Sequence, residues 1–159
     1  MAFVYSIVYQ PTDQKYEQRQ DNYLRVAAQE VNLITDLGIE GDQKARRHSK
    51  RQLNLLSYEW LEKMQAQGFR TKPGDFGEQL ILRGLAVEEL PSGARLQIGA
   101  QAVIEITKPR TGCDRLQAAQ TSSIRAIQSR VGMLARVLTG GPIRVGDPVT
   151  VLPENQPAS

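Results

Sequence analysis

The hydrophobic positions of the chain fall in short runs, and many of them alternate with polar positions in the two-residue period of a β-strand. In the segment Ala102 to Thr107, Ile104 and Ile106 share one predicted face, and the residues between them lie on the other. The other predicted strands are Phe3 to Tyr9, the second half of Tyr23 to Ile34, Gln52 to Leu56, Glu78 to Leu82, Ala94 to Ile98, Leu134 to Leu138, Ile143 to Val145 and Val149 to Leu152.

Two segments have helical character. Ser57 is a good N-cap for a helix over Tyr58 to Gln67, which places Trp60 and Met64 one turn apart on the predicted buried face. A second short helix is predicted from Ser122 or Ser123 to Arg130. Two or three short helices at the rim of a mainly β fold therefore match the pattern.

Turns with glycine separate the predicted strands. Gly38 to Asp42 and Pro73 to Gly77 are predicted turns in which Asp42 and Asp75 bond to nearby backbone, and the pair Gly140 and Gly141 marks a hairpin. Pro11 to Asn22 is polar and without periodicity, so it is predicted to be a loop. Short strands at near-regular spacing predict an all-β fold, a closed or partly open β-barrel.

Length and composition fit one domain. The chain has 159 residues, of which 40% are hydrophobic. We expect a single domain over residues 1–152 and a disordered polar tail over 153–159. No apolar run reaches a membrane span, and the first residues lack the order of a signal peptide, so a cytoplasmic location without membrane partners is expected. A lone cysteine excludes an internal disulfide and multi-cysteine metal sites.

Positive charge is concentrated in the run from Lys44 to Arg51, although the net charge is only +3. The arginine fork matches phosphate oxygens, so Arg46, Arg47 and Arg51 are candidates for a phosphate clamp; the alternative is a solvated basic loop. His48 could donate a proton or simply add charge or a hydrogen bond. Nucleic acid is an unlikely partner, because aromatic residues make up only 6% of the chain.

The only cysteine, Cys113, stands among cations that would favour its thiolate: Lys108, Arg110 and Arg115. A thiolate attacks electrophiles, accepts sulfur or ligates a soft metal. Pro109 makes a continuous strand through this segment improbable, so Cys113 is predicted on a loop that follows a strand. The alternative is a buried apolar cysteine.

Several short motifs occur in an order that resembles the MOSC domain family, named for the C-terminal domain of molybdenum cofactor sulfurases. The match extends from Gly38 to Leu152. The motifs are Gly38 to Asp42, Arg51 to Leu56, Pro73 to Leu80, Leu90 to Gly99, Pro109 to Cys113, Ala135 to Leu138 and Gly146 to Val149.

The resemblance implies a β-barrel with one reactive cysteine and an association with the molybdenum cofactor. Cys113 is the matching position, which in the family either holds sulfur as a persulfide or ligates molybdenum in members that reduce N-hydroxylated compounds. Pyridoxal phosphate is not expected, since it belongs to a separate domain of the full-length sulfurases. One departure is Gln79, where the family usually has asparagine.

Two functions from different classes are thus open at the level of sequence. The first is a MOSC protein that uses Cys113 with the molybdenum cofactor, as a reductase or a sulfurtransferase, with an electron-transfer protein or a cysteine desulfurase as partner. The second is a non-catalytic module whose basic loop, residues 44–51, binds an anionic metabolite or nucleic acid.

Overall fold

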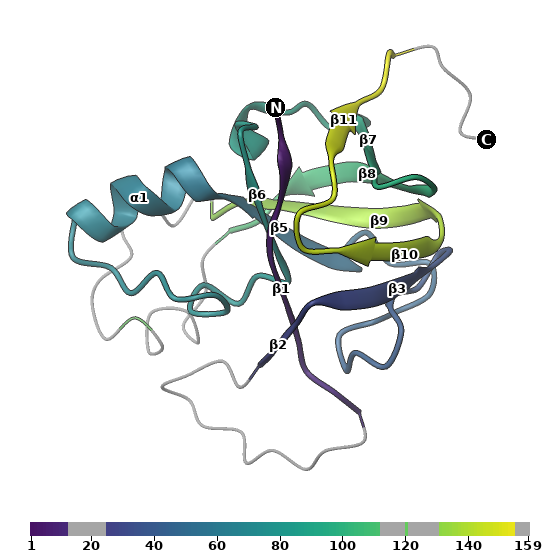
Figure 1. Cartoon of the computed structure of the whole chain (residues 1–159), viewed down its shortest axis with the longest axis horizontal. Coiled ribbons are helices and arrows are strands. Elements are labelled where there is room, and N and C mark those ends of the chain that lie inside the picture. The colour runs from purple at the N-terminus through teal and green to yellow at the C-terminus, as the bar shows by residue number, and fades with distance from the viewer. Residues whose placement is uncertain (13–24, 112–119, 121–130, 155–159) are drawn as a thin grey trace.

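The computed structural model describes residues 1–12, 25–111, 120 and 131–154, and these are mostly β-structure (Figure 1). The strands are β1 (Phe3–Tyr9), β2 (Val26–Ala28), β3 (Glu30–Ile34), β4 (Gly38–Ile39), β5 (Leu53–Ser57), β6 (Leu80–Arg83), β7 (Arg95–Ile98), β8 (Ala102–Pro109), β9 (Met133–Thr139), β10 (Gly141–Arg144) and β11 (Val149–Val151). The helices with described bounds are α1 (Tyr58–Ala66) and a 3₁₀ turn over Val87–Glu89.

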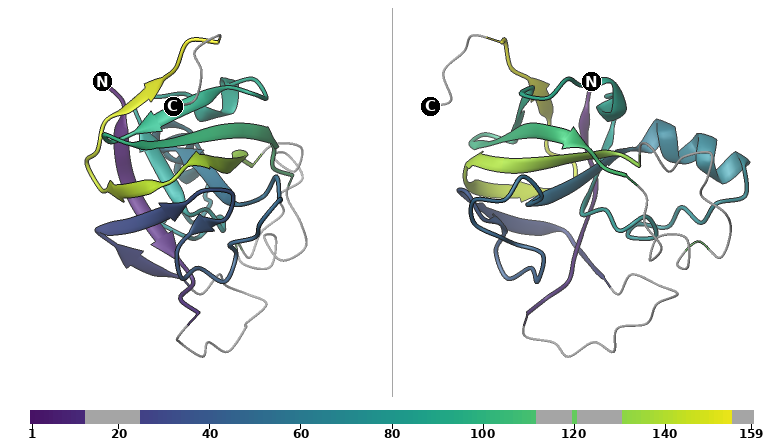
Figure 2. Two further views of the ribbon diagram at one scale, coloured as in Figure 1. Left: turned by 90° about the vertical axis from the view of Figure 1, so that its right-hand side faces the viewer. Right: turned by 180° about the vertical axis from the view of Figure 1, so that it is seen from behind.

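Eight of the strands form one curled sheet in the order β11-β7-β8-β9-β5-β6-β1-β2. Its neighbouring strands are antiparallel except for β5 and β6, which run parallel. A parallel pair needs a crossover connection, and α1 lies in that connection. Figures 1 and 2 show α1 at one end of the barrel, away from β10 and β3.

The sheet curls until the start of β1 meets the chain at the start of β11, which lies at the opposite end of the sheet order. Val4 N donates to Asp147 O at 2.9 Å, Gly146 N donates to Val4 O at 2.8 Å, and Val149 N donates to Ala2 O at 3.0 Å. These bonds bring β1 beside the other end of the sheet order. The prediction of a mainly β, partly open barrel is therefore confirmed.

A smaller sheet in the order β10-β3-β4 covers one side of the barrel. The prediction of a hairpin at Gly140 and Gly141 is wrong, because β10 pairs with β3, with Gly141 opposite Leu33, and not with β9. The glycines instead carry the chain from one sheet to the other. A Cβ on Gly140 would lie 2.5 Å from Leu33 O, so the close approach to β3 requires glycine.

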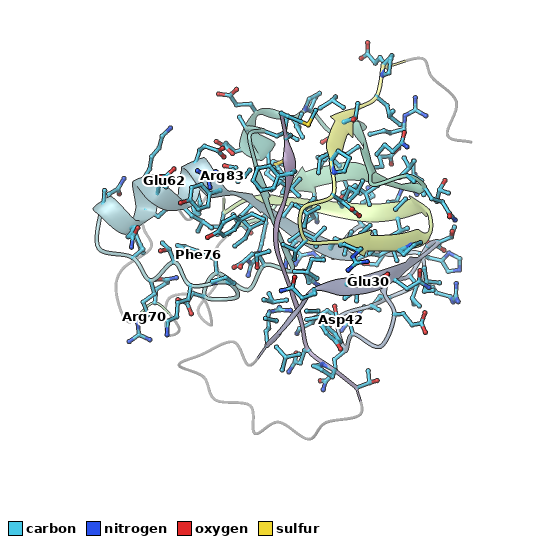
Figure 3. The ribbon with its side chains drawn as sticks, in the orientation of Figure 1. Glu30, Asp42, Glu62, Arg70, Phe76 and Arg83 are labelled. Carbon is cyan, nitrogen blue, oxygen red and sulfur yellow. The ribbon has the colours of Figure 1, made fainter. Side chains whose placement is uncertain are left out.

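The apolar residues form two clusters. The larger fills the barrel with strand residues such as Leu55, Leu80 and Ile104, all nearly inaccessible to solvent. The smaller lies under α1, where the ring of Phe76 meets that of Trp60 in a T-shaped contact at 5.2 Å. Figure 3 shows Phe76 on the same side of the molecule as α1. Trp60 is thus a packing residue, as predicted.

The local predictions hold with small shifts. Ser57 caps α1, because its Oγ accepts from Trp60 N at 3.1 Å. The predicted turn from Gly38 to Asp42 begins as the short strand β4. The helix predicted to end at Arg130, most of the loop from Pro11 to Asn22 and the final residues 155–159 lie outside the described residues. None of the helices in the described residues has the length and apolar character of a membrane span.

Candidate functional site

A cavity of ≈ 380 Å³ opens where the basic loop, β5, the turn before β6 and the end of β8 meet. Its lining residues are Arg25, Lys44, Arg46, Ser49, Arg51, Asn54, Gly77, Gln79, Arg110, Thr111 and Leu134. Five of these carry a positive charge, and none of the described lining residues is acidic. The cavity is therefore suited to a small anion with several negative charges.

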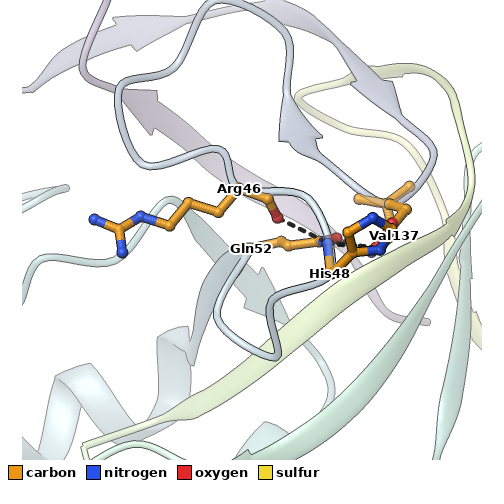
Figure 4. Close-up of polar contacts among 5 residues, drawn as sticks. Arg46, His48, Gln52 and Val137 are labelled. Atoms are coloured by element: carbon orange, nitrogen blue, oxygen red, sulfur yellow. Dashed lines mark hydrogen bonds and ion pairs between the residues drawn. The ribbon is translucent and has the colours of Figure 1, made fainter.

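The basic loop is held to the barrel by Gln52, whose side chain is fully buried. Its Nε2 donates to Arg46 O at 2.9 Å and to Asp36 Oδ1 at 3.0 Å, and its Oε1 accepts from Val137 N at 2.9 Å on β9 (Figure 4). A second bond, from Arg46 N to Leu37 O, fixes the same residue. The main chain of Arg46 is thus tied to the sheet, and its side chain lines the cavity.

His48 and Asp36 form a separate contact at the outer side of the loop. His48 Nδ1 lies 2.8 Å from Asp36 Oδ2, and the backbone N–H of His48 donates to Asp36 Oδ1 at 3.1 Å. The hydrogen bond from Gln52, followed by the contacts with His48, lowers the pKa of Asp36. The His48 side chain is 87% exposed and does not line the cavity. This geometry fits the predicted role of adding charge or a hydrogen bond rather than that of donating a proton.

Two polar side chains, those of Asp42 and Gln79, form a buried hydrogen-bond network with the backbone of Asn54 at the cavity wall. Asp42 Oδ1 accepts from the backbone N–H groups of Gln10 and Lys44, which confirms that Asp42 is a turn former. Its Oδ2 accepts from Gln79 Nε2 at 3.2 Å, and Gln79 Oε1 accepts from Asn54 N at 2.8 Å. The long amide of Gln79 thus joins Asp42 to β5.

The turn before β6 is organised by two charged groups. Glu78 is buried, and its carboxylate accepts from the backbone N–H groups of Gly74 and Phe76. Arg110 is also largely buried and donates through Nη1 to Phe76 O. Burial raises the pKa of Glu78 to about 7, although the backbone bonds and Arg25 act in the opposite direction.

Asp75 lies in the same turn, where its Oδ2 accepts from the backbone N–H of Lys72 at 2.9 Å. This bond fits the turn-forming role predicted for it. Loss of solvation raises the pKa of Asp75.

Arg110 also marks the point where the chain leaves β8. Its backbone N–H donates to Gly132 O at 3.0 Å, and its carbonyl accepts from Val131 N at 2.7 Å. Further along, Gln120 is anchored through Nε2 to the carbonyls of Arg70 and Asp75. The chain between these anchors contains Cys113 and Arg115, which both lie outside the described residues.

Of the predicted site residues, Arg46, Arg51 and Arg110 come together at the cavity. Arg47 and Lys108 are exposed and do not line it. Thr111, two positions before Cys113 in the sequence, does line it. The predicted loop position of Cys113 and its role stay predictions.

The cavity also contains Arg25 and Asn54, which the sequence analysis did not connect with the site. It contains Lys44 and Gln79 as well, which the sequence analysis named only as part of the basic loop and as a departure from the family pattern. Asn54 could have been found as a polar residue inside an otherwise apolar strand, and Lys44 belongs to the basic run. Arg25 has no comparable signal in its sequence neighbourhood. Among the described residues, no group of three or more His, Cys, Asp or Glu side chains could hold a metal ion.

A family model of the MOSC domain matches residues 42–150. This chain belongs to the MOSC domain family. The resemblance seen in the order of its motifs is confirmed, and the cavity of this MOSC domain lies within or next to the matched residues, apart from Arg25. A search of curated proteins gave no match.

Solved structures share the fold of this MOSC domain. YiiM from Geobacillus stearothermophilus is 21% identical, with a TM-score of 0.72 over 96% of this chain and 76% of that one. YiiM from Escherichia coli is 23% identical, with a TM-score of 0.63 over 97% and 72% of the two chains. The YuaD protein from Bacillus subtilis is 16% identical, with a TM-score of 0.67 over 94% of each chain. These likenesses establish the fold.

Proposed function

We propose that this MOSC domain binds the molybdenum cofactor in its basic cavity and that Cys113 is the thiol that acts there. The observation that carries the proposal is the group of five cationic side chains around one cavity, in a chain whose family is named for molybdenum cofactor sulfurases. Thr111 at the cavity wall brings the chain within two residues of Cys113.

The described residues fit the cofactor in charge and in hydrogen-bonding capacity. Arg46, Arg51 and Arg110 offer guanidinium groups that bind phosphate oxygens in pairs, and Lys44 adds a point charge. Asn54 supplies an amide at the wall for the polar edge of a pterin. When bound, the cofactor supplies a redox-active molybdenum centre that a single protein thiolate can ligate.

The role of this chain's own residues is to bind the anion and to keep the thiol ionised. The charges of Arg110, Lys108 and Arg115, all close in sequence, favour the thiolate of Cys113. That thiolate has two uses: it ligates molybdenum in a reductase of N-hydroxylated compounds supplied by an electron-transfer protein, or it carries sulfur. A cytoplasmic location suits both uses, because the thiol stays reduced there.

Sulfur carriage is a balanced exchange between two proteins. The Cys113 thiolate attacks the outer sulfur of a persulfide on a cysteine desulfurase, a new S–S bond forms on Cys113, and the donor's S–S bond breaks with its own thiolate leaving. After incubation with such a donor, the intact mass should rise by about 32 Da in the wild type and stay constant in Cys113→Ser. A constant mass in the wild type would leave molybdenum ligation as the use of the thiol.

The cofactor proposal is tested by purification from a host that makes the cofactor. We expect molybdenum and pterin to copurify with the wild type and to fall at least about tenfold in Arg46→Gln/Arg51→Gln, which removes two charge-assisted contacts. The control is Arg83→Gln/Arg144→Gln, which removes the same charge from exposed arginines outside the cavity. Equal, negligible pterin in the wild type and both variants would refute the proposal.

Cys113→Ser separates this function from a non-catalytic anion-binding module. Under the proposal, the variant retains the cofactor through the cavity but loses the use of the thiol, which is either the persulfide or the reduction of N-hydroxylated compounds. A wild type that forms no persulfide, together with a variant that reduces these compounds as fast as the wild type, would show that Cys113 is incidental. The basic cavity would then be the whole of the functional site.

A further inference from the structure

Asn54 carries a hydrogen-bond acceptor that none of the described residues uses. Its side chain lines the basic cavity, and its Oδ1 is buried without a hydrogen-bond partner. Few buried polar atoms of folded proteins lack a partner, and leaving one unsatisfied costs about 1–3 kcal/mol. Because Asn54 also lines the cavity, its unused acceptor points to a donor on the ligand.

The orientation of the Asn54 amide is fixed by its other contacts. Its Nδ2 donates to Gly77 O at 3.2 Å, and its backbone N–H donates to Gln79 Oε1 at 2.8 Å. Rotation of the amide by a half turn would place Oδ1 against the carbonyl oxygen of Gly77, which is repulsive. Oδ1 is therefore the atom left for a ligand.

Gln79, the other amide at the wall, is occupied by the protein. Its Oε1 accepts from Asn54 N, and its Nε2 donates to Asp42 Oδ2. Asp42 in turn accepts from the backbone of Gln10, so the network is anchored in the fold. Gln79 thus positions the backbone of Asn54. Of these two amide side chains, Asn54 is the one that has an unused acceptor.

An unused acceptor among cations restricts the ligand. The oxygens of a phosphate are themselves acceptors and would face the arginines, because a carbonyl oxygen repels them. A group that satisfies Asn54 Oδ1 must carry an N–H or O–H. The cavity therefore matches a ligand with an anionic end and a separate hydrogen-bond donor.

We propose that Asn54 Oδ1 is the specificity-determining acceptor of the cavity, and that it selects anionic ligands bearing an N–H donor over ligands of equal charge without one. This inference rests on the anion-binding part of the proposed function and is independent of the role of Cys113. It assigns charge recognition to the arginines and donor recognition to Asn54.

The test uses three probes on the purified full chain in calorimetric titrations. Pyrophosphate reports the cations alone. Guanosine 5′-diphosphate has ring N–H and amino donors, whereas purine riboside 5′-diphosphate has the same charge and ribose but no donor on its base. One neutral hydrogen bond corresponds to a preference of roughly threefold to tenfold for the guanosine compound in the wild type.

The variant Asn54→Leu removes Oδ1, together with the bond from Nδ2 to Gly77 O, and leaves the cations of the cavity in place. It should therefore still bind pyrophosphate and should bind the two nucleotides equally. Asn32→Leu is the matched control, because Asn32 is exposed on β3 outside the cavity. It should keep the wild-type preference.

Each outcome separates this inference from the proposed function. Pyrophosphate binding without a preference between the nucleotides in the wild type would overturn the role of Asn54 and leave the cavity intact as an anion site. A preference that persists in Asn54→Leu would also overturn it. No binding of any probe would refute this inference and the anion-binding part of the proposed function, whereas copurification of pterin tests binding of the cofactor itself. The wild-type comparison needs no variant, so it stands even where Asn54→Leu fails to fold.

Discussion

The amide nitrogen of Gln52 lies 2.9 Å from the carbonyl oxygen of Arg46, so a fully buried side chain of the barrel fixes a residue of the basic loop. The same side chain accepts from Val137 N on β9. We predict that Gln52→Leu lowers the free energy of unfolding by roughly 3 kcal/mol, because it leaves these buried backbone groups without a partner. Urea denaturation followed by circular dichroism would measure the loss.

The matched control for this change is Gln101→Leu, because Gln101 is exposed and donates a single bond to Gly140 O. Its cost should stay within about 0.5 kcal/mol. The loop should also move in Gln52→Leu, so affinity for pyrophosphate should fall while that of Gln101→Leu does not. Equal stabilities of the two variants would contradict the anchoring role of Gln52.

Glu78 makes the stability of the protein depend on pH near neutrality. Burial raises the pKa of its carboxyl from 4.5 to about 7 in the folded protein. Between these values the folded state holds a proton that the unfolded chain has released, so the free energy of unfolding falls as pH rises. The contribution is complete below pH 4.5 and lost above about 7.

The predicted size of this loss is about 3 kcal/mol, from the 1.36 kcal/mol that corresponds to each pKa unit. The variant Glu78→Gln cannot titrate, so its stability should lack this part of the pH dependence. Urea titrations at several pH values would compare it with Glu62→Gln, whose carboxyl is exposed on α1. Parallel pH profiles for the wild type and Glu78→Gln would show that Glu78 is ionised throughout.

Gly132 and Gly41 form a matched pair for testing a close backbone contact. Both have φ of +81°, but a Cβ on Gly132 would lie 2.3 Å from Leu55 O, whereas a Cβ on Gly41 would meet nothing within 4 Å. Gly41→Ala should cost about 1 kcal/mol through its backbone conformation alone. Gly132→Ala should cost roughly 2 kcal/mol more, because β5 must shift.

Thermal unfolding of the two glycine variants would measure the difference. Equal losses would mean that the chain beside Arg110 adjusts without strain. A larger loss of stability in Gly132→Ala would show that Gly132, which is hydrogen-bonded to Arg110, is held tightly against β5.

Ser57 connects the start of α1 to the 3₁₀ turn. Its Oγ accepts from Trp60 N and donates to Glu88 Oε2 at 2.9 Å. Ser57→Ala should therefore lower the free energy of unfolding by about 1–2 kcal/mol, the usual cost of a lost N-cap. Ser92→Ala, in an exposed turn, should be neutral in the same denaturation experiment. A neutral Ser57→Ala would show that solvent replaces the cap.

Sequence periodicity was sufficient for most strands because burial of one face alternates with exposure of the other. β8 illustrates this, since Ile104 and Ile106 are fully buried while Glu105 is only partly so. The pairing of strands is set by contacts distant in sequence. The prediction of a hairpin at Gly140 and Gly141 was therefore wrong, because β10 pairs with β3, whose residues are more than a hundred positions away in the sequence.

The part of the candidate site that could be predicted is the part whose charged residues lie close together in the sequence. Arg46 and Arg51 belong to a visible basic run, and Arg110 flanks Cys113. Arg25 joins them only through the fold, from the start of β2, so no local pattern could indicate it. The unused acceptor of Asn54 depends on the direction of one amide, which requires coordinates.

The bonds between residues 2–4 and residues 146–149 have a consequence for synthesis of the protein. β1 is made more than a hundred residues before this neighbour in the barrel. Contacts of such large sequence separation form slowly, and the exposed strand edge can meet other chains in the meantime. Completion of this barrel must therefore wait until residues 146–149 have been made, and truncation before residue 146 would leave β1 open to intermolecular pairing.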